Sequence, residues 1–360
     1  MSEAWIIDGM RSPRGRGKAG VGSLSEVHPQ RILAQVLNGL QDKVGFDPAD
    51  VEDVIAGNGS GTGDHAHDIA RMAVLDAGWP ISTPGLTLHR FCGSGQQAVT
   101  VAAQSIMAGH QDLVIGGGVE SMSRYAPNHT DGFTANNKHL FEQYPLIPQG
   151  ISADLIATIE GFSREDCDAY GVRSQERTQA STAAGYFKSG IVPIYHNDGR
   201  LALDHDEHPR PGTTLENMAG LNASFQKMGT TLYEGQARTF DDICTSLYPD
   251  IKAVNHVHHA GNSSGVVDGA SAILLASPAY AKAHGLKPRA RIVMTATAGT
   301  EPVIMLTAPG PAARIALRKA GMTVDDIDLF EVNEAFAAVV LKVQKDLGVG
   351  DDIINVAGGA

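Results

Sequence analysis

The chain has 360 residues, of which 42% are hydrophobic and 41 are glycine, and its formal net charge at pH 7 is -12. This length predicts two or three subdomains, and the composition is typical of a packed α/β protein with many tight turns. An acidic surface does not attract nucleic acid or an anionic membrane, so neither is expected as a partner.

The cysteines and the N-terminal segment bear on the cellular compartment. Cys92, Cys167 and Cys244 lie far apart in the sequence. That spacing argues against a disulfide framework and predicts a reducing, cytoplasmic location. The start, MSEAWIIDGM, indicates a first strand rather than a signal peptide, and no apolar run approaches the length of a membrane span.

The first third of the chain alternates strands with helices. The expected elements are a strand at 5–8, a helix at 29–44 opened by Pro29, a strand at 51–58, a helix at 68–78 ended by Gly78, a strand at 87–91, a helix at 94–109 and a strand at 112–118. This alternation indicates right-handed crossover units and a largely parallel or mixed sheet.

The alternation stops between 122 and 254, a stretch rich in Asp, His, Asn and Pro. Its one clear helix is expected from Ser163, as N-cap, to about Phe187. We therefore expect a lid or insertion carried by the α/β core. Regular α/β structure is expected again at 268–285, 290–299, 311–320 and 327–348.

A short internal repeat aligns GFDPADVEDVIAGN (45–58) with GMTVDDIDLFEVNE (321–334) without gaps. Each copy predicts a helix end, an acidic turn and a buried strand. The repeat suggests two related halves.

Cys92 is the first candidate catalytic residue. It stands at a predicted strand-to-helix junction, in FCGSGQQA. The N–H groups and positive dipole end of the following helix favour a thiolate, which is the nucleophilic form of cysteine. The alternative is a buried structural cysteine, which has about equal weight from cysteine's general preference for protein cores.

A second candidate lies in EVNEAFAAVV (331–340), where Glu331, Asn333 and Glu334 interrupt an apolar stretch at a predicted strand-to-helix junction. A buried Asn can hold a water or a carbonyl oxygen, as an oxyanion site requires. The alternative is an ordinary helix start, with Asn333 as the cap and Glu334 favoured by the dipole.

The third candidate is HHAGNSSGVVDGAS (258–271), whose small residues permit close approach of a ligand to the backbone. The alternative is a simple glycine-rich turn. His256, His258 and His259 lack a nearby cysteine or a second ligand pair, so no metal is expected there. The run GNGSGTG (57–63) has neither the lysine nor the spacing of a nucleotide-phosphate loop.

Four motifs occur in order along the chain: FCGSGQQA around Cys92, GGGVESMSR (116–124), AGNSSGVVDGA (260–270) and NEAFA (333–337). Together they resemble the thiolase family of acetyl-CoA acetyltransferases and 3-ketoacyl-CoA thiolases. The segments RSPRG (11–15) and 206–221 agree with the family as well, so the resemblance extends over essentially the whole chain.

The resemblance implies a thiolase-like α/β fold with two related halves in layers of sheet and helix. The implied domains are an N-terminal half at 1–121 and 255–285, a loop domain at 122–254 that covers CoA, and a C-terminal half at 286–360. It also implies a homodimer or homotetramer that acts on acyl-CoA and CoA as substrates and needs no cofactor.

The resemblance also implies residue roles. Cys92 would take the acyl group as a thioester, and a second acetyl-CoA (synthesis) or CoA (degradation) would react with it. Asn333 would hold a water against the thioester carbonyl, Glu334 would orient the catalytic histidine, and Phe336 would wall the acyl pocket. Ala260 and Ser264 would contact the pantetheine arm.

Gln149 marks one departure from the family. It lies in PQGIS (148–152), where short-chain biosynthetic thiolases place a histidine–methionine pair near the substrate. A different or wider acyl pocket is therefore expected. His259 also replaces the small residue that is common before the alanine of the AGN motif.

The sequence ends at Ala360, before the family's glycine–histidine–proline segment and its second catalytic cysteine. We therefore expect the second half to be incomplete, with little turnover by these 360 residues but retained acylation at Cys92. The alternative function is a non-catalytic acyl-CoA-binding or scaffold subunit. Ketoacyl synthases share the cysteine but not VESMSR or NEAFA, and are disfavoured.

Overall fold

A computed structural model describes residues 3–125, 137–232 and 237–359. The backbone divides into two compact units, each assembled from three segments. Unit 1 is Met1–His129, Phe187–His208 and Val266–Val293, and unit 2 is Thr130–Tyr186, Pro209–Gly265 and Met294–Ala360. The domain limits inferred from the sequence, with a loop domain over 122–254, stay a prediction.

Unit 1 contains the strands and the helices that cover them. Its main elements are β1 (Trp5–Arg11), β2 (Gly15–Arg16), α1 (Pro29–Val44), β3 (Asp53–Gly57), α2 (Ile69–Asp76), β4 (Gly85–Leu88), α3 (Ser94–Met107), β5 (Leu113–Ser121), β6 (Ile194–Tyr195), β7 (Leu201–Leu203), β8 (Val267–Ala276), α10 (Pro278–Ala283) and β9 (Ala290–Arg291). Short 3₁₀ helices lie at Pro48–Asp50, Gly63–His65, Met122–Arg124 and Lys188–Gly190.

Seven of these strands form one mixed sheet in the order β4-β3-β5-β8-β1-β9, with β2 paired to β8. β3 is parallel to β4 and to β5, whereas β8 is antiparallel to β5 and to β1. The mixed α/β sheet predicted from the sequence is therefore confirmed.

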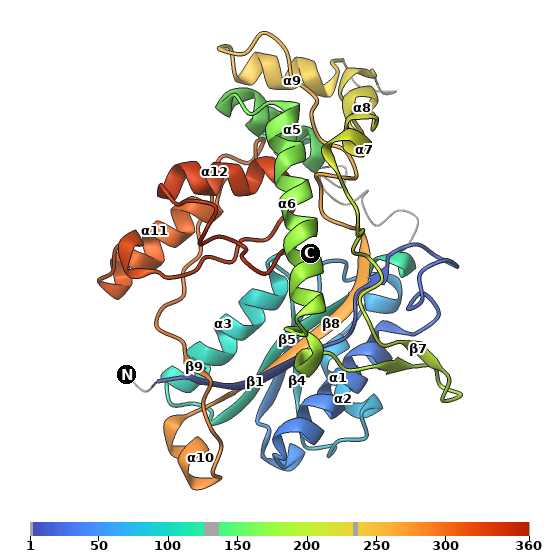
Figure 1. Ribbon diagram of the computed structural model, residues 1–360. Helices are drawn as coiled ribbons and strands as arrows, with labels where there is room; N and C mark the ends of the chain where they lie inside the picture. Colours follow the sequence, from blue (N-terminus) through green and yellow to red (C-terminus); the bar gives the residue numbers. More distant parts are fainter. Residues whose placement is uncertain (1–2, 126–136, 233–236, 360) are drawn as a thin grey trace. The chain divides into compact units, whose positions relative to one another are not determined.

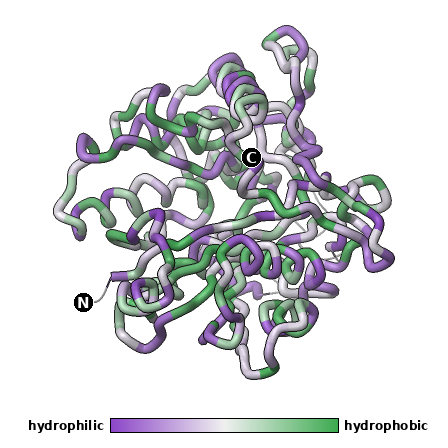
Figure 2. The backbone as a smooth tube through the Cα atoms, turned by 60° about the horizontal axis from the view of Figure 1, so that its bottom comes forward, coloured by the Kyte–Doolittle hydropathy of each residue, from purple (hydrophilic) through white to green (hydrophobic). Residues whose placement is uncertain are grey.

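Alternating strand residues bury the two faces of this sheet against different helices. Val54 and Ala56 of β3 belong to the apolar core shared with α1 and α2, while Ile55 between them packs with Ala98 and Ala102 of α3. Figure 1 shows α1 and α2 on one face and α3 on the other. Hydrophobic and hydrophilic residues interchange along the helices in Figure 2, as expected for helices with one buried face. The start of α3, directly after Cys92, is thus held against the sheet.

Two motifs without an assigned role meet in unit 1. Asp206 accepts a bidentate pair of hydrogen bonds from the Arg11 guanidinium, at 2.7 and 2.8 Å, and a third from the Arg14 backbone N–H at 2.8 Å. Burial opposes ionisation of Asp206, but the hydrogen bond from Arg11 and the charge of Arg14 lower its pKa to about 2. The contact fastens the segment around 206 to the strand β1.

Unit 2 is mainly helical. Its elements are α4 (Lys138–Gln143), α5 (Gln149–Glu160), α6 (Arg164–Ala183), α7 (Leu215–Ala219), α8 (Gln226–Thr230), α9 (Phe240–Leu247), α11 (Pro309–Ala320), a 3₁₀ helix at Val324–Asp326 and α12 (Ala337–Leu347). Helices α5, α6 and α12 contribute to one apolar core. Among the described residues of this unit the chain forms isolated bridges, Ser263↔Phe336 and Phe330↔Ile354, rather than strands.

The internal repeat is only partly reflected in the structure. Both α1 and α11 end at a left-handed glycine, Gly45 or Gly321, and both are followed by an acidic 3₁₀ turn. The strand β3 follows in the first copy. The buried strand expected after the acidic turn of the second copy (321–334) is wrong: Phe330 makes an isolated bridge with Ile354, and the Val332 N–H donates to the Asn355 side chain instead of a partner strand.

Two other expected elements are shorter than predicted. In the segment 290–299 the structure has only the two-residue edge strand β9. Its pairing with β1 ends at the hydrogen bond from the Ile292 N–H to the Ala4 carbonyl. Helix α6 begins after Ser163, whose hydroxyl caps it as predicted, but it ends at Ala183 rather than near Phe187.

Candidate active site

Cys92 lies in a tight turn between β4 and α3. The predicted strand 87–91 is wrong at its end, since β4 stops at Leu88 and Phe91 adopts a left-handed φ of 47°. The Ser94 hydroxyl closes this turn: it accepts a hydrogen bond from the Arg90 N–H at 2.8 Å and donates one to the Phe91 carbonyl at 2.6 Å. Gly93 is the N-cap of α3, so Cys92 directly precedes the helix.

Exposure distinguishes Cys92 from the other cysteines. Cys92 is exposed, whereas Cys167 and Cys244 are buried. Burial, together with nearby aspartates, raises the pKa of each buried thiol to about 12. A thiol is nucleophilic only as its thiolate, so burial makes Cys167 and Cys244 poor nucleophiles, whereas the exposed Cys92 is accessible to a ligand. The alternative of a buried structural cysteine is wrong for this residue.

A carboxyl group that sequence reasoning did not single out lies beside the same turn. Glu120, near the end of β5, accepts a 2.6 Å hydrogen bond from the Gly59 N–H and bonds the Tyr125 side chain. Burial raises the pKa of Glu120, and burial together with Glu120 and the charge of Cys92 raises the pKa of Tyr125. The sequence signal that could have pointed to Glu120 is its position as the single carboxylate near the end of the apolar run GGGVES.

The AGN and NEAFA motifs lie side by side in unit 2. The Ser264 N–H donates to the Ala335 carbonyl, and the Ala337 N–H donates to the Asn262 carbonyl, each at 3.0 Å. Phe336, only 7% exposed, bridges to Ser263 and packs edge-on against His258. The structure thus brings Ser264 and Phe336, two predicted substrate contacts, to one place.

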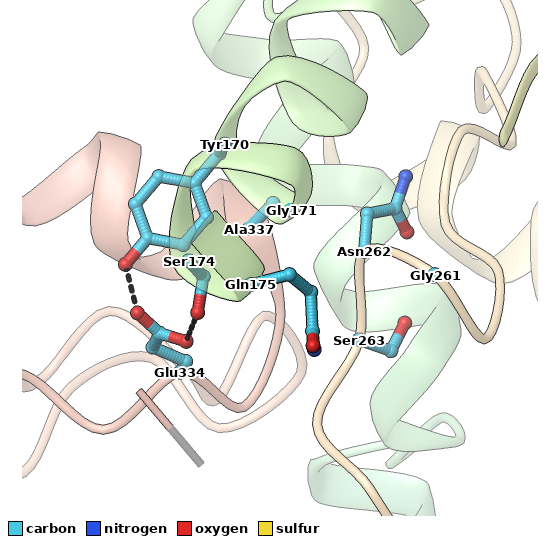
Figure 3. Close-up of a pocket in the computed structure, with 9 residues that line it drawn as sticks. All are labelled: Tyr170, Gly171, Ser174, Gln175, Gly261, Asn262, Ser263, Glu334 and Ala337. Carbon is cyan, nitrogen blue, oxygen red and sulfur yellow. Dashed lines mark hydrogen bonds between the residues drawn. The ribbon is translucent and has the colours of Figure 1, made fainter. Parts of the chain in front are cut away.

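Glu334 is held by three donors. Its Oε1 accepts hydrogen bonds from the Tyr170 hydroxyl and the Asn355 amide at 2.5 and 2.9 Å, and its Oε2 accepts one from the Ser174 hydroxyl at 2.6 Å. Figure 3 shows this carboxylate at one side of a small cavity, with Asn262 and Ser263 at the other. The charge of Glu334, added to burial, raises the pKa of Tyr170.

The other predicted residues of unit 2 are exposed. Asn333 does not cap a helix, because α12 begins at Ala337 with Phe336 as its N-cap, so the helix-cap alternative is wrong. Ala260 lies at the open side of the AGN turn, and Gln149 is the first residue of α5. All three side chains remain available to a ligand.

The histidines before the AGN motif bind buried carboxylates. Asp154, fully buried in α5, accepts hydrogen bonds from His256 and His258 Nδ1 at 2.8 and 2.7 Å, and Asp168 pairs with His259 at 2.7 Å. These pairs fasten the AGN segment to α5 and α6. Across residues 3–125, 137–232 and 237–359, no cluster of three or more His, Cys, Asp or Glu is placed to bind a metal.

Cys92 belongs to unit 1, and the other predicted site residues belong to unit 2. In the part of the chain that the structure describes, no helix is long and apolar enough to cross a membrane.

Comparison with known families matches residues 4–242 to the thiolase N-terminal domain and residues 286–360 to the thiolase C-terminal domain. The chain is 39% identical to a 3-oxoadipyl-CoA/3-oxo-5,6-dehydrosuberyl-CoA thiolase of Escherichia coli, over 100% of this chain and 88% of that protein. It is 38% identical to a steroid 3-ketoacyl-CoA thiolase of Mycobacterium tuberculosis, over 100% of this chain and 83% of that protein.

A solved structure shows a similar fold. The crystal structure of the Bacillus anthracis acetyl-CoA acetyltransferase superposes with a TM-score of 0.82 at 33% identity, covering 100% of this chain and 86% of that one.

Proposed function

The chain belongs to the thiolase family and is an acyl-CoA acyltransferase, and from that premise we propose that Cys92 carries the acyl group during transfer. The observation that supports this role is the contrast among the cysteines: Cys92 is exposed at the turn before α3, while the other two are buried. In the proposed step the Cys92 thiolate attacks the thioester carbonyl of acyl-CoA. The carbon–sulfur bond to CoA breaks, CoA leaves as its thiolate, and acyl-Cys92 remains.

The same intermediate serves both directions of the reaction. In degradation, the Cys92 thiolate attacks the 3-keto carbon of a 3-ketoacyl-CoA, the C2–C3 bond breaks, and the acetyl-CoA carbanion gains a proton and leaves as acetyl-CoA. CoA thiolate then takes the acyl group from Cys92, which leaves as its thiolate. In synthesis, the carbanion of a second acetyl-CoA attacks acyl-Cys92 instead. Thioester exchange between cysteine and CoA is nearly balanced, so one site can work in either direction.

The motifs of unit 2 are proposed to bind the substrate. Ser264 and Ala260 would contact the pantetheine arm, and Phe336 would wall the acyl group; the support is that Ser264 and Phe336 lie on adjoining segments joined by hydrogen bonds. Exposed Asn333 would hold the water that binds the thioester carbonyl. Glu334, fixed by Tyr170, Ser174 and Asn355, would orient the polar groups of the site.

The acyl group is proposed to be larger than acetyl. Exposed Gln149 stands where short-chain biosynthetic thiolases place a histidine–methionine pair. Two similar proteins are named for dicarboxylic and steroid 3-ketoacyl-CoA substrates, although another is named an acetyl-CoA acetyltransferase. A wider pocket would extend this activity to degradation of long or bulky acyl chains, sterol side chains included.

Isotope exchange between acyl-CoA and labelled free CoA tests the proposal, because exchange requires acylation and deacylation of Cys92 alone. Acetyl-CoA, a dicarboxylic acyl-CoA and a ring-bearing acyl-CoA are compared. We expect exchange in the wild type and in Cys244→Ala but not in Cys92→Ser, with the larger acyl groups exchanging faster. Binding of acyl-CoA without exchange would instead support the non-catalytic alternative.

We also propose a homodimer or homotetramer in the cytoplasm. The family resemblance supports the assembly, and three free cysteines support a reducing compartment. Light scattering on the purified protein checks the assembly, and a monomeric mass would contradict it.

A further inference from the structure

A chain of hydrogen bonds leads from the buried strand β5 to the residue before Cys92. The Gly59 N–H donates to Glu120 Oε2 at 2.6 Å, and the Gly59 carbonyl accepts a 2.7 Å hydrogen bond from His89 Nε2. His89 Nδ1 in turn accepts the Phe91 N–H at 3.3 Å. Four residues, Glu120, Gly59, His89 and Phe91, thus connect the sheet with the nucleophile turn; we name them the turn support.

The partners of His89 fix its tautomer. A backbone carbonyl only accepts, so Nε2 must carry the proton toward Gly59. A backbone N–H only donates, so Nδ1 must be unprotonated toward Phe91. Both ring nitrogens are therefore engaged by backbone groups of Gly59 and Phe91. The role open to His89 is positioning rather than general-base catalysis.

Phe91 needs such support because of its backbone. Its φ of 47° lies in the left-handed region, where a residue with a bulky side chain is strained. Its side chain contributes little burial to offset that strain, being 63% exposed. The Phe91 N–H donates to His89 Nδ1 and the Phe91 carbonyl accepts from the Ser94 hydroxyl, and both side-chain hydrogen bonds support the turn in this conformation. An aromatic edge-on contact between His89 and Phe91, at 5.0 Å, adds to them.

We propose that His89 is a positioning residue for Cys92: by accepting the Phe91 N–H while anchored to Gly59, it holds the strained turn that presents the cysteine sulfur to acyl-CoA. The inference rests on the proposed role of Cys92 and adds to it the residue that sets the direction of the sulfur. The sequence alone showed no role for His89. One of its partners, Gly59, lies in a loop 30 positions earlier, and the other, Phe91, lies two positions later.

Three substitutions separate the two hydrogen bonds of His89. In His89→Asn, the side-chain oxygen takes the place of Nδ1 and keeps the acceptor for Phe91, as in an Asx turn. In His89→Gln, the amide nitrogen takes the place of Nε2 and keeps the donor to Gly59, but the acceptor for Phe91 is lost. His89→Ala loses both. The matched control is His205→Ala, a histidine of the same unit whose side chain is 75% exposed.

The readouts are the rate of Cys92 acylation by acetyl-CoA, the rate of its alkylation by iodoacetamide, and the thermal unfolding midpoint. We expect His89→Ala and His89→Gln to acylate at least about fivefold more slowly, the factor that loss of one hydrogen bond typically gives. We expect His89→Asn to recover most of the rate, and His205→Ala to match the wild type. The unfolding midpoints of all four variants should stay close together, because the turn is exposed.

Two outcomes overturn the inference while leaving the proposed function intact: equal acylation rates in all variants, or a rate in His89→Asn as low as in His89→Ala. Failure of the proposed function is distinguishable, because the wild type itself would then remain unacylated by acetyl-CoA while iodoacetamide still alkylates Cys92.

Discussion

Gly57→Ala is expected to destabilise unit 1 and to misplace Cys92 at the same time. Gly57 ends β3, and a Cβ atom added there would lie 2.2 Å from the Ser94 carbonyl carbon and 2.4 Å from the Gly95 nitrogen. These are backbone atoms of the first turn of α3, so no side-chain rotation relieves the contact. Ordinary van der Waals contact begins at about 3.4 Å, so the two elements must separate by about 1 Å.

Neither element moves easily. β3 is paired on both edges, with β4 and with β5, and Ala98 and Ala102 of α3 are fully buried against the sheet. Overpacking at such a site costs about 1–3 kcal/mol. At about 2 °C per kcal/mol for a chain of this size, the thermal unfolding midpoint should fall by about 2–6 °C. Because Ser94 closes the Cys92 turn, a shift of about 1 Å should slow acylation by up to about 100-fold.

The assay combines a thermal scan with the rate of CoA release from acetyl-CoA. Gly95→Ala is the matched control: among the described residues its added Cβ meets the Gly117 carbonyl, at an ordinary contact distance of 3.7 Å, and alanine is the better helix former. The control should melt at or above the wild-type midpoint. A Gly57→Ala protein with wild-type midpoint and wild-type acylation would refute the reasoning.

Three further outcomes follow from buried contacts. The pKa of Asp206 is lowered from 3.8 to about 2, so the ionised carboxylate contributes about 2 kcal/mol of stability above pH 3.8, and this is lost as the pH falls through 2. In urea unfolding, Asp206→Asn should be less stable than the wild type at pH 7, and the difference should disappear in acid. A stability difference that does not depend on pH would contradict this. Tyr170→Phe removes one donor from Glu334 and should cost about 1 kcal/mol, against none for Phe substituted at Tyr186, which is 71% exposed. Phe336→Ala should lower the free energy of unfolding by about 3–5 kcal/mol in the same urea assay. A decrease below about 1 kcal/mol would contradict the burial of Phe336 in the core.

Local signals allowed the limits of several helices to be predicted. Pro29 at the first position and left-handed Gly45 just beyond the end set the limits of α1, and both act within one turn of the helix. The Ser163 cap likewise placed the start of α6. Because these signals depend on neighbouring residues only, they are readable from the sequence.

Long-range pairing was not predictable in the same way. Strand β8 lies between β5 and β1, and residues 187–208 group with the N-terminal sheet, partly through a hydrogen bond from the Val192 N–H to the Arg11 carbonyl. No local pattern encodes such partners. The strand predicted before Cys92 is longer than the observed strand β4 for a related reason. The turn that ends it depends on Ser94 and on His89, and His89 is held by Gly59 of another loop.

The candidate site was predicted unevenly. Cys92 is a candidate from the sequence because a lone cysteine among glycines before a helix is a local pattern, and its catalytic role stays a prediction. Glu120 was missed because it ends a strand of apolar residues, and its partner Gly59 lies far from it in the sequence. Asn333 and Glu334 also remain predicted site residues, and the sequence did not show that the donors that hold Glu334 come from α6 and from Asn355.

The location of the acyl group after a short incubation with acetyl-CoA and an acid quench tests the central claim most directly. Peptide mass spectrometry should find acetyl on the peptide that contains Cys92, and unmodified thiols at buried Cys167 and Cys244. Acetyl on either buried cysteine, or an unmodified Cys92 in protein that iodoacetamide still alkylates, would contradict the assignment of Cys92 as the acyl carrier.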